Sequence, residues 1–256
     1  MNYLDIAVKR DGPIAFLTIN RPEKLNALRE RTRKEMGSAL RTFGSDSKVR
    51  CVVMEGGGGR AFSAGQDLSE SMNVEPEVAK QWVKEFDELY ADILSIPQPL
   101  VTSASGYATG SGWQVYLLGD YRIASTGARF AMTEINVGIP CITGSTILES
   151  LISLSEVNRL VLMAEMIDAK EAFRLGLVHK FVSDSNIKEE TMKVAKILAE
   201  KPKVAVRLQK EFTRELFAKK LDLGVRRAIT AHTKAFRSGE PQAIMTKFVN
   251  KRKKPN

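Results

Sequence analysis

The sequence predicts an α/β fold that ends in a helical region. Between residues 4 and 132, short apolar segments typical of strands alternate with amphipathic segments of helical period. Beyond residue 144 strand signals nearly vanish, and residues 201–256 are basic with helical spacing. We therefore expect a core region over residues 1–200 and a C-terminal helical region over residues 201–256.

Two apolar segments near the N-terminus predict a strand–turn–strand unit. Residues 4–9 and 14–19 flank the turn sequence Asp11-Gly12-Pro13. After the break at Asn20-Arg21-Pro22, a helix is expected because apolar residues recur at near-helical spacing: Leu28, Thr32, Met36, Leu40 and Phe43.

The middle of the chain continues the alternation. Residues 76–95 give the clearest helical pattern, and Pro97 and Pro99 end it. After residue 144, the one strand signal lies at residues 177–182. Four earlier segments have the composition of buried strands: 49–54, 100–104, 121–125 and 128–132.

Composition excludes several classes of protein. With 43% hydrophobic and 27% charged residues the chain is globular, and no apolar stretch reaches the roughly 20 residues that span a bilayer. Cys51 and Cys141 cannot form a disulfide framework, and the N-terminus is unlike a signal peptide, so we expect a cytoplasmic protein.

Several common catalytic motifs are also missing from the sequence, among them Gly-x-Ser-x-Gly and the P-loop. His179 and His232 lack a partner at metal-ligand spacing, so no metal site is expected.

Two loops of small residues follow predicted buried strands, at residues 61–68 and 105–114. Small residues let a ligand approach the main chain, and a glycine-rich turn into a helix presents N–H groups. Two such groups aimed at one point would stabilise an oxyanion. Tight turns beneath a packed sheet would have the same composition, so both interpretations stay open on composition alone.

A series of motifs runs in fixed order through nearly the whole chain. It comprises Asn20-Arg21-Pro22-x-x-x-Asn26-Ala27-Leu28, Phe62-Ser63-Ala64-Gly65-x-Asp67-Leu68, Gly106-Tyr107-Ala108-x-Gly110-x-Gly112, residues 130–140, Ala169-x-x-Ala172-x-x-x-Gly176-Leu177-Val178 and Phe248-Val249-x-Lys251-Arg252. This series resembles the crotonase superfamily, the enoyl-CoA hydratase/isomerase group. The resemblance implies a spiral core of ββα turns and C-terminal helices that form a homotrimer or, in pairs of trimers, a homohexamer. It also implies acyl-CoA substrates, of which coenzyme A is a part, and no metal or redox cofactor; the short apolar stretches already argue against a membrane partner.

The resemblance also implies roles for particular residues. Gln66 and Ser111, the latter where many members have glycine, are expected to supply two oxyanion N–H groups, and Glu134 is expected to act in catalysis. Further positions match residues that contact the substrate: Lys24, Leu25, Ala64, Asp67, Leu68, Gly110 and Gln114, with Phe248 and Lys251 toward the adenine end.

One departure from the family pattern decides the predicted reaction. Hydratases of this family use two glutamates, but the first position holds Gln114, whose amide cannot accept a proton. We therefore predict isomerase-type chemistry, in which Glu134 is the single base and an oxyanion hole stabilises the thioester enolate. Hydration or decarboxylation by the same site remain alternatives. So do a structural ion pair for Glu134 and a catalytically inactive member that acts as an assembly partner. Bulky Cys141 and Ile142 predict an altered acyl pocket, and no histidine in the motif supports Cys141 as a nucleophile.

The basic C-terminal region raises an alternative of another class. Of its residues, 16 are Lys or Arg and four are acidic, and a cationic stripe is expected at Lys203, Arg207, Lys210 and Arg214. RNA binding is an alternative that the sequence does not favour, because Phe212 and Phe217 are expected to be core anchors and no base-stacking motif is present. A solvated helix face explains the stripe.

Overall fold

The computed structural model describes residues 2–71 and 75–253, and its central feature is a six-stranded sheet. The strand order is β1-β2-β3-β5-β7-β10; β1 and β2 pair antiparallel and the remaining pairs are parallel. The strands are β1 (Ile6–Asp11), β2 (Ile14–Ile19), β3 (Cys51–Gly56), β5 (Leu100–Ala104), β7 (Tyr121–Ser125) and β10 (Lys180–Val182).

A second sheet of short strands accompanies the first, in the order β4-β6-β8-β9. Its strands are β4 (Ala61–Ser63), β6 (Tyr107–Thr109), β8 (Arg129–Ala131) and β9 (Ile167–Asp168). Each of β4, β6 and β8 directly follows a strand of the large sheet, and a helix comes next in the chain. This repeated strand–strand–helix turn is the predicted spiral, and the α/β fold class is confirmed.

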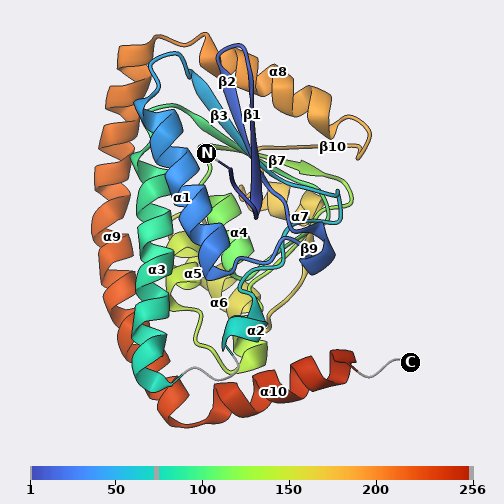
Figure 1. The fold of residues 1–256 in the computed structure, drawn as a ribbon, viewed down its shortest axis with the longest axis vertical. Coiled ribbons are helices and arrows are strands. Elements are labelled where there is room, and N and C mark those ends of the chain that lie inside the picture. The colour runs from blue at the N-terminus through green and yellow to red at the C-terminus, as the bar shows by residue number, and fades with distance from the viewer. Residues whose placement is uncertain (1, 72–74, 254–256) are drawn as a thin grey trace.

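Helices cover both faces of the large sheet. Because side chains alternate along a strand, Cys51 and Val53 face α8 (Ile187–Ala199), whereas Val52 and Met54 face the main core. In Figure 1, α8 crosses the top of the sheet, α1 lies against its other side, and α3 packs beside α1. The helices of the core region are α1 (Glu30–Ser45), α2 (Leu68–Ser71), α3 (Pro76–Ser95), α4 (Ser111–Leu117), α5 (Ile142–Glu149), α6 (Leu154–Leu162), α7 (Ala169–Arg174) and α8.

The C-terminal region folds back onto the core. α9 (Lys203–Arg237) is 35 residues long and runs beside α3, and α10 (Glu240–Lys253) turns across the lower end of the molecule (Figure 1). Gly224 lets α9 approach α5, since a Cβ there would lie 2.4 Å from Thr146 Oγ1. Residue 200 lies in the short connection between α8 and α9, and the division of the chain there stays a prediction.

Most long elements lie where the sequence predicts them. The helix at 76–95 and the strands at 100–104 and 121–125 have the expected bounds. β4 and β6 lie inside the two loops of small residues, and β9 lies in a stretch that was expected to be helical. These strands of two or three residues were missed because they are too short to show an alternating pattern.

The structure corrects one prediction for the basic C-terminal region. Phe217 packs partly against the core, but the prediction that Phe212 is a core anchor was wrong, since Phe212 is 56% exposed. It belongs to an exposed apolar face of α9, here called the α9 stripe, which consists of Val204, Leu208, Phe212, Leu216 and Leu223. Lys210 instead pairs with Asp120 at 2.5 Å, and Arg207 pairs with Glu211. Among the described helices, none is both long and apolar enough to cross a membrane.

Candidate active site

A cavity of about 910 Å³ brings the two loops of small residues together with α3, α4 and the segment after β8. Its lining includes all but two of the residues that the resemblance selects: Lys24, Leu25, Ala64, Gln66, Asp67, Leu68, Gly110, Ser111, Gln114 and Glu134. The other two, Phe248 and Lys251, belong to α10, but their side chains lie outside the part of the structure that is described.

The two loops touch through a glycine. Gly65 has a φ of +84°, and a Cβ there would lie 2.6 Å from the carbonyl oxygen of Thr109 and 3.3 Å from the nitrogen of Ser111. Gly110, with a φ of +53°, occupies the next position, where a Cβ would lie 3.6 Å from the Glu134 carboxyl group. These contacts bring the main chain of both loops and the Glu134 side chain to one end of the cavity.

Main-chain pairing sets the direction of the Gln66 peptide. Leu28 forms a parallel bridge with Gln66, in which the Leu28 N–H donates to Gly65 and the Leu28 carbonyl accepts from Asp67. In a parallel pair, the residue between the two hydrogen-bonded neighbours turns its own N–H and C=O to the opposite side. The Gln66 N–H therefore points away from Leu28.

The Ser111 N–H is left free within α4 by its position at the start of the helix. Ser111 is the first residue of α4, so its N–H has no acceptor within that helix. Its Oγ is buried and has no hydrogen-bond partner among the described residues. The oxyanion roles of Ser111 and Gln66 stay predictions, with both peptides on the cavity wall.

Two buried polar side chains hold the first loop. The Asn26 amide donates to the carbonyls of Gly57 and Ala61 at 2.9 and 2.7 Å, and Arg21 pairs with Asp67 at 2.9 Å. Burial acts to raise the pKa of Asp67, but hydrogen bonds from Ser69 and Arg21 outweigh it and hold that pKa below its ordinary value. Asp67 lines the cavity as a paired carboxylate, which anchors the loop beside Gln66.

Glu134 begins the short 3₁₀ helix η2 (Glu134–Val137), directly after β8. Its Oε1 accepts a hydrogen bond from Gln114 Nε2 at 2.6 Å, and Oε2 is buried with no hydrogen-bond partner among the described residues. Burial raises the pKa of Glu134. Its own backbone N–H, the Gln114 amide and the Cys141 thiol offset part of that rise. A desolvated carboxylate with a raised pKa is a stronger base once it is ionised.

A chain of hydrogen bonds fixes the orientation of Gln114. This side chain is 3% exposed, and its Oε1 accepts from the Tyr90 hydroxyl at 2.8 Å and from Thr143 Oγ1 at 3.1 Å. With two donors on the oxygen, the NH₂ group faces Glu134. Sequence reasoning missed Tyr90 and Thr143; the one signal was a phenol on the apolar face of the helix at 76–95.

Aromatic side chains of α3 form another wall, and α9 contributes to it. The rings of Trp82 and His232 meet edge to face at 5.9 Å, and both line the cavity with Phe86 and Tyr90. His232 bonds the Ala228 carbonyl, and burial lowers its pKa, so the imidazole is neutral at pH 7.

Cys141 lines the cavity near Glu134. Burial and the neighbouring Glu134 raise the pKa of its thiol well above the ordinary value, so the thiolate that a nucleophile requires does not form at neutral pH. No group of three or more potential metal ligands occurs among residues 2–71 and 75–253.

Comparison with known proteins identifies relatives along the whole chain. The Enoyl-CoA hydratase/isomerase family model matches residues 9–256. The chain is 30% identical over 254 residues to a short-chain-enoyl-CoA hydratase of Clostridium acetobutylicum, covering 99% of this chain and 97% of the relative. It is also 30% identical over 254 residues to a crotonyl-CoA hydratase of Syntrophomonas wolfei, covering 99% and 98%. The crystal structure of an enoyl-CoA hydratase/isomerase from Mycobacterium paratuberculosis superposes with a TM-score of 0.87 at 25% identity, covering 95% of this chain and 98% of that one.

The contact between the loops can be tested with two glycine substitutions. Gly65→Ala and Gly59→Ala both place a Cβ at positive φ, which costs roughly 1–2 kcal/mol. Gly59 has nothing within 4 Å, so its variant should show that cost alone. Gly65→Ala must also push the loops apart, and chemical denaturation should show a clearly larger loss of unfolding free energy. Equal losses in the two variants would contradict the close contact.

Proposed function

Because the chain belongs to the enoyl-CoA hydratase/isomerase family, we propose that it is an enzyme that enolises an acyl-CoA thioester and shifts a carbon–carbon double bond, with Glu134 as its one base. The hydrogen bond of 2.6 Å from Gln114 Nε2 to Glu134 Oε1 carries this proposal. It joins an ionisable group to an amide that can orient and donate but cannot take up a proton.

The proposed reaction uses one proton and returns it to the substrate. With the thioester oxygen between the N–H groups of Gln66 and Ser111, the Glu134 carboxylate removes a proton from C2 of a 3-enoyl-CoA. The electron pair is delocalised over the thioester oxygen and C4, and the two N–H groups stabilise the oxyanion. Glu134 then returns the proton to C4, which leaves the double bond between C2 and C3.

The proposed reaction requires no cofactor. No electrons leave the substrate and no group is transferred, so the steps require a base, an oxyanion hole and the bound thioester. Coenzyme A enters as part of the substrate, and Lys24 and Leu25 on the cavity rim are proposed to contact it.

Hydration is the second candidate, and the names of the relatives favour it. The relatives from Clostridium acetobutylicum and Syntrophomonas wolfei are both named hydratases. In that reaction Glu134 would act on a water molecule beside C3 of a 2-enoyl-CoA, and Gln114 would hold the water through its amide. Because the amide cannot exchange a proton with the water, we expect hydration to be slow in this protein.

Glu134→Gln tests the proposed base. The substitution keeps the size of the side chain but removes the proton acceptor, so turnover of 3-enoyl-CoA should fall by about 10²–10⁴-fold while the Kd for a saturated acyl-CoA changes little. In the unsubstituted protein, kcat/KM should rise with pH through the raised pKa of Glu134 and then level off. Full activity of the variant would contradict the proposal.

The same variant supplies a control for correct folding. Since the pKa of Glu134 is higher in the folded than in the unfolded chain, ionising it destabilises the fold as pH rises above 4.5. Glu134→Gln should therefore be more stable than the unsubstituted protein at pH 7, and the difference should shrink as the pH falls toward 4.5 and be absent below it. A variant that is both inactive and less stable at pH 7 would point to misfolding.

Gln114→Glu tests why hydration should be slow. A second carboxyl group at this position restores a proton donor and acceptor beside Glu134, so hydration of a 2-enoyl-CoA should increase by about 10-fold or more. Gln114→Met, which fills similar volume without polar atoms, serves as the matched control and should not increase hydration. Efficient hydration by the unsubstituted protein would favour the second candidate instead.

We also propose that the chain forms a homotrimer or homohexamer. The α9 stripe places five exposed apolar side chains on one side of a long helix, and large exposed apolar groups of this kind mark contacts between proteins. Light scattering should give three or six times the chain mass of 28.4 kDa. The double variant Phe212→Asp/Leu216→Asp should shift the mass toward one chain, whereas Ile197→Asp, an exposed apolar side chain of α8, should not. A mass of 28.4 kDa for the unsubstituted protein would contradict assembly.

A further inference from the structure

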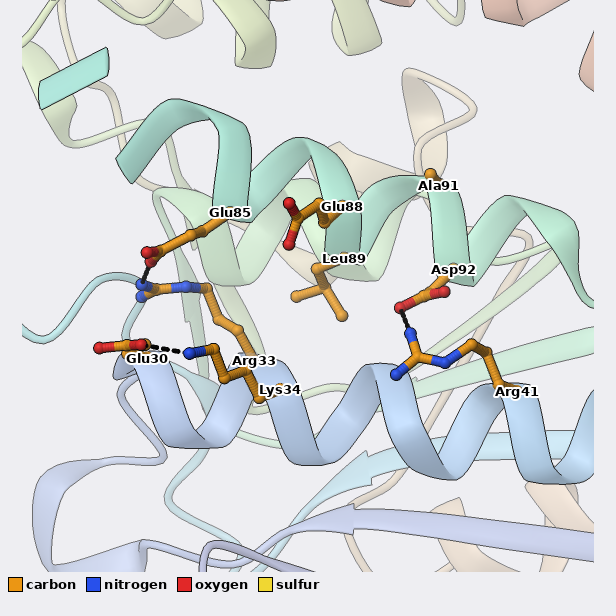
Figure 2. A pocket seen from close by; sticks show the side chains of 9 residues that line it. All are labelled: Glu30, Arg33, Lys34, Arg41, Glu85, Glu88, Leu89, Ala91 and Asp92. Atoms are coloured by element: carbon orange, nitrogen blue, oxygen red, sulfur yellow. Dashed lines mark hydrogen bonds and ion pairs between the residues drawn. The ribbon is translucent and has the colours of Figure 1, made fainter. Parts of the chain in front are cut away.

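Two arginines of α1 reach across to acidic side chains of α3. Figure 2 shows Arg33 paired with Glu85 and, two turns further along, Arg41 paired with Asp92. Both pairs join the same two helices, but their surroundings differ. Arg33 is 4% exposed, whereas the Arg41 side chain is largely in solvent.

Arg33 has further partners in the first loop of small residues. Its Nη1 donates to the side-chain oxygen of Gln66 at 3.0 Å and to the carbonyl oxygen of Leu28 at 3.2 Å. Leu28 and Gln66 are the two residues of the parallel bridge that directs the Gln66 N–H. One guanidinium therefore binds both residues of that bridge.

The Leu28 carbonyl connects Arg33 to the main chain beside Gln66. It also accepts the N–H of Asp67, at 3.3 Å, which is a long hydrogen bond. The Arg33 guanidinium adds a charged donor to the same oxygen. On its other side, Asp67 is held by Arg21. Arg33 and Arg21 thus both act on the Asp67 side of Gln66, and the peptide on its other side, which carries the Gln66 N–H, is held by the Leu28 N–H through the Gly65 carbonyl.

Arg33 is itself held rigidly. Its guanidinium lies 4.7 Å from the centre of the Phe86 ring and pairs with Glu85, both on α3. Its Nε is buried and, among the described residues, has no hydrogen-bond partner. Burying a cation with an unsatisfied N–H costs free energy, and such costs are typical of residues that serve a functional site.

We propose that Arg33 is a positioning residue, which aims the oxyanion N–H of Gln66 by clamping the Leu28–Gln66 bridge to α3. The inference rests on the proposed function, because it assigns Arg33 an effect on the enolate rather than on coenzyme A. A donor stabilises developing charge when it is preorganised toward the oxygen that receives it. Arg33 does this without touching the substrate.

Acetoacetyl-CoA provides a direct readout, because its C2 proton is acidic and the enolate absorbs in the near ultraviolet. An oxyanion hole raises the fraction of bound acetoacetyl-CoA that is enolate. The Kd for free coenzyme A measures binding of the part of the ligand that lacks the acyl group. The variants are Arg33→Met, Arg33→Lys and the matched control Arg41→Met, which breaks the other ion pair between α1 and α3. Lysine at 33 keeps a charge but has one nitrogen and cannot reach Gln66, Leu28 and Glu85 together.

Arg33→Met should lower the ratio of bound enolate to bound keto form by roughly 10-fold or more, with an unchanged Kd for coenzyme A. Arg33→Lys should show a smaller loss, and it decides the matter if Arg33→Met does not fold. Arg41→Met should change neither quantity.

Three results would overturn the inference. An unchanged enolate ratio in both Arg33 variants would refute positioning while leaving the proposed function in place. An equal loss in Arg41→Met, or a parallel loss of coenzyme A affinity, would show that helix packing is responsible. If the unsubstituted protein binds coenzyme A but forms no enolate, the proposed function fails and the inference fails with it.

Discussion

The close approach of Gly65 to the main chain of residues 109–111 is the constraint on which the candidate site depends. The approach requires glycine, because a Cβ would overlap the Thr109 carbonyl, and it places one loop from each of two successive spiral turns at the same point. Around it, Asn26, Arg21 and Asp67 satisfy one another and the loop main chain, so the loop keeps its shape without help from a ligand. Preorganised main-chain donors of this kind do not have to be reoriented during a reaction.

A second feature is the linear order of polar groups behind Glu134. Tyr90 and Thr143 donate to Gln114, and Gln114 donates to Glu134, so each group is oriented by the one behind it. The far carboxylate oxygen lacks a donor among the described residues, which leaves the raised pKa of Glu134 in place. The arrangement sacrifices some stability at neutral pH and keeps the carboxylate reactive.

Long periodic segments and the motif series could be predicted from the sequence; contacts between distant segments could not. The helix at 76–95 has an apolar face over several turns, so its bounds were correct. The short strands β4, β6 and β9 are instead stabilised by pairing within the second sheet, β4 with β6 and both β6 and β9 with β8. Gln114 and Glu134 could be selected by resemblance, and the structure places them 2.6 Å apart. Arg33 and Tyr90 could not, since an arginine in an amphipathic helix and a tyrosine on an apolar face look ordinary until their partners are known. Phe212 was assigned to the core because sequence does not distinguish a core face from one exposed on a single chain.

The position of His232 in the cavity wall has a consequence for biosynthesis. β2, β3, β5 and α3 leave the ribosome well before α9, which carries His232 against Trp82. Until α9 docks, the aromatic face of α3 is open to water and to other nascent chains. The last helical region thus covers the aromatic wall of the cavity, and a polypeptide truncated before α9 would leave that apolar face exposed and prone to aggregation.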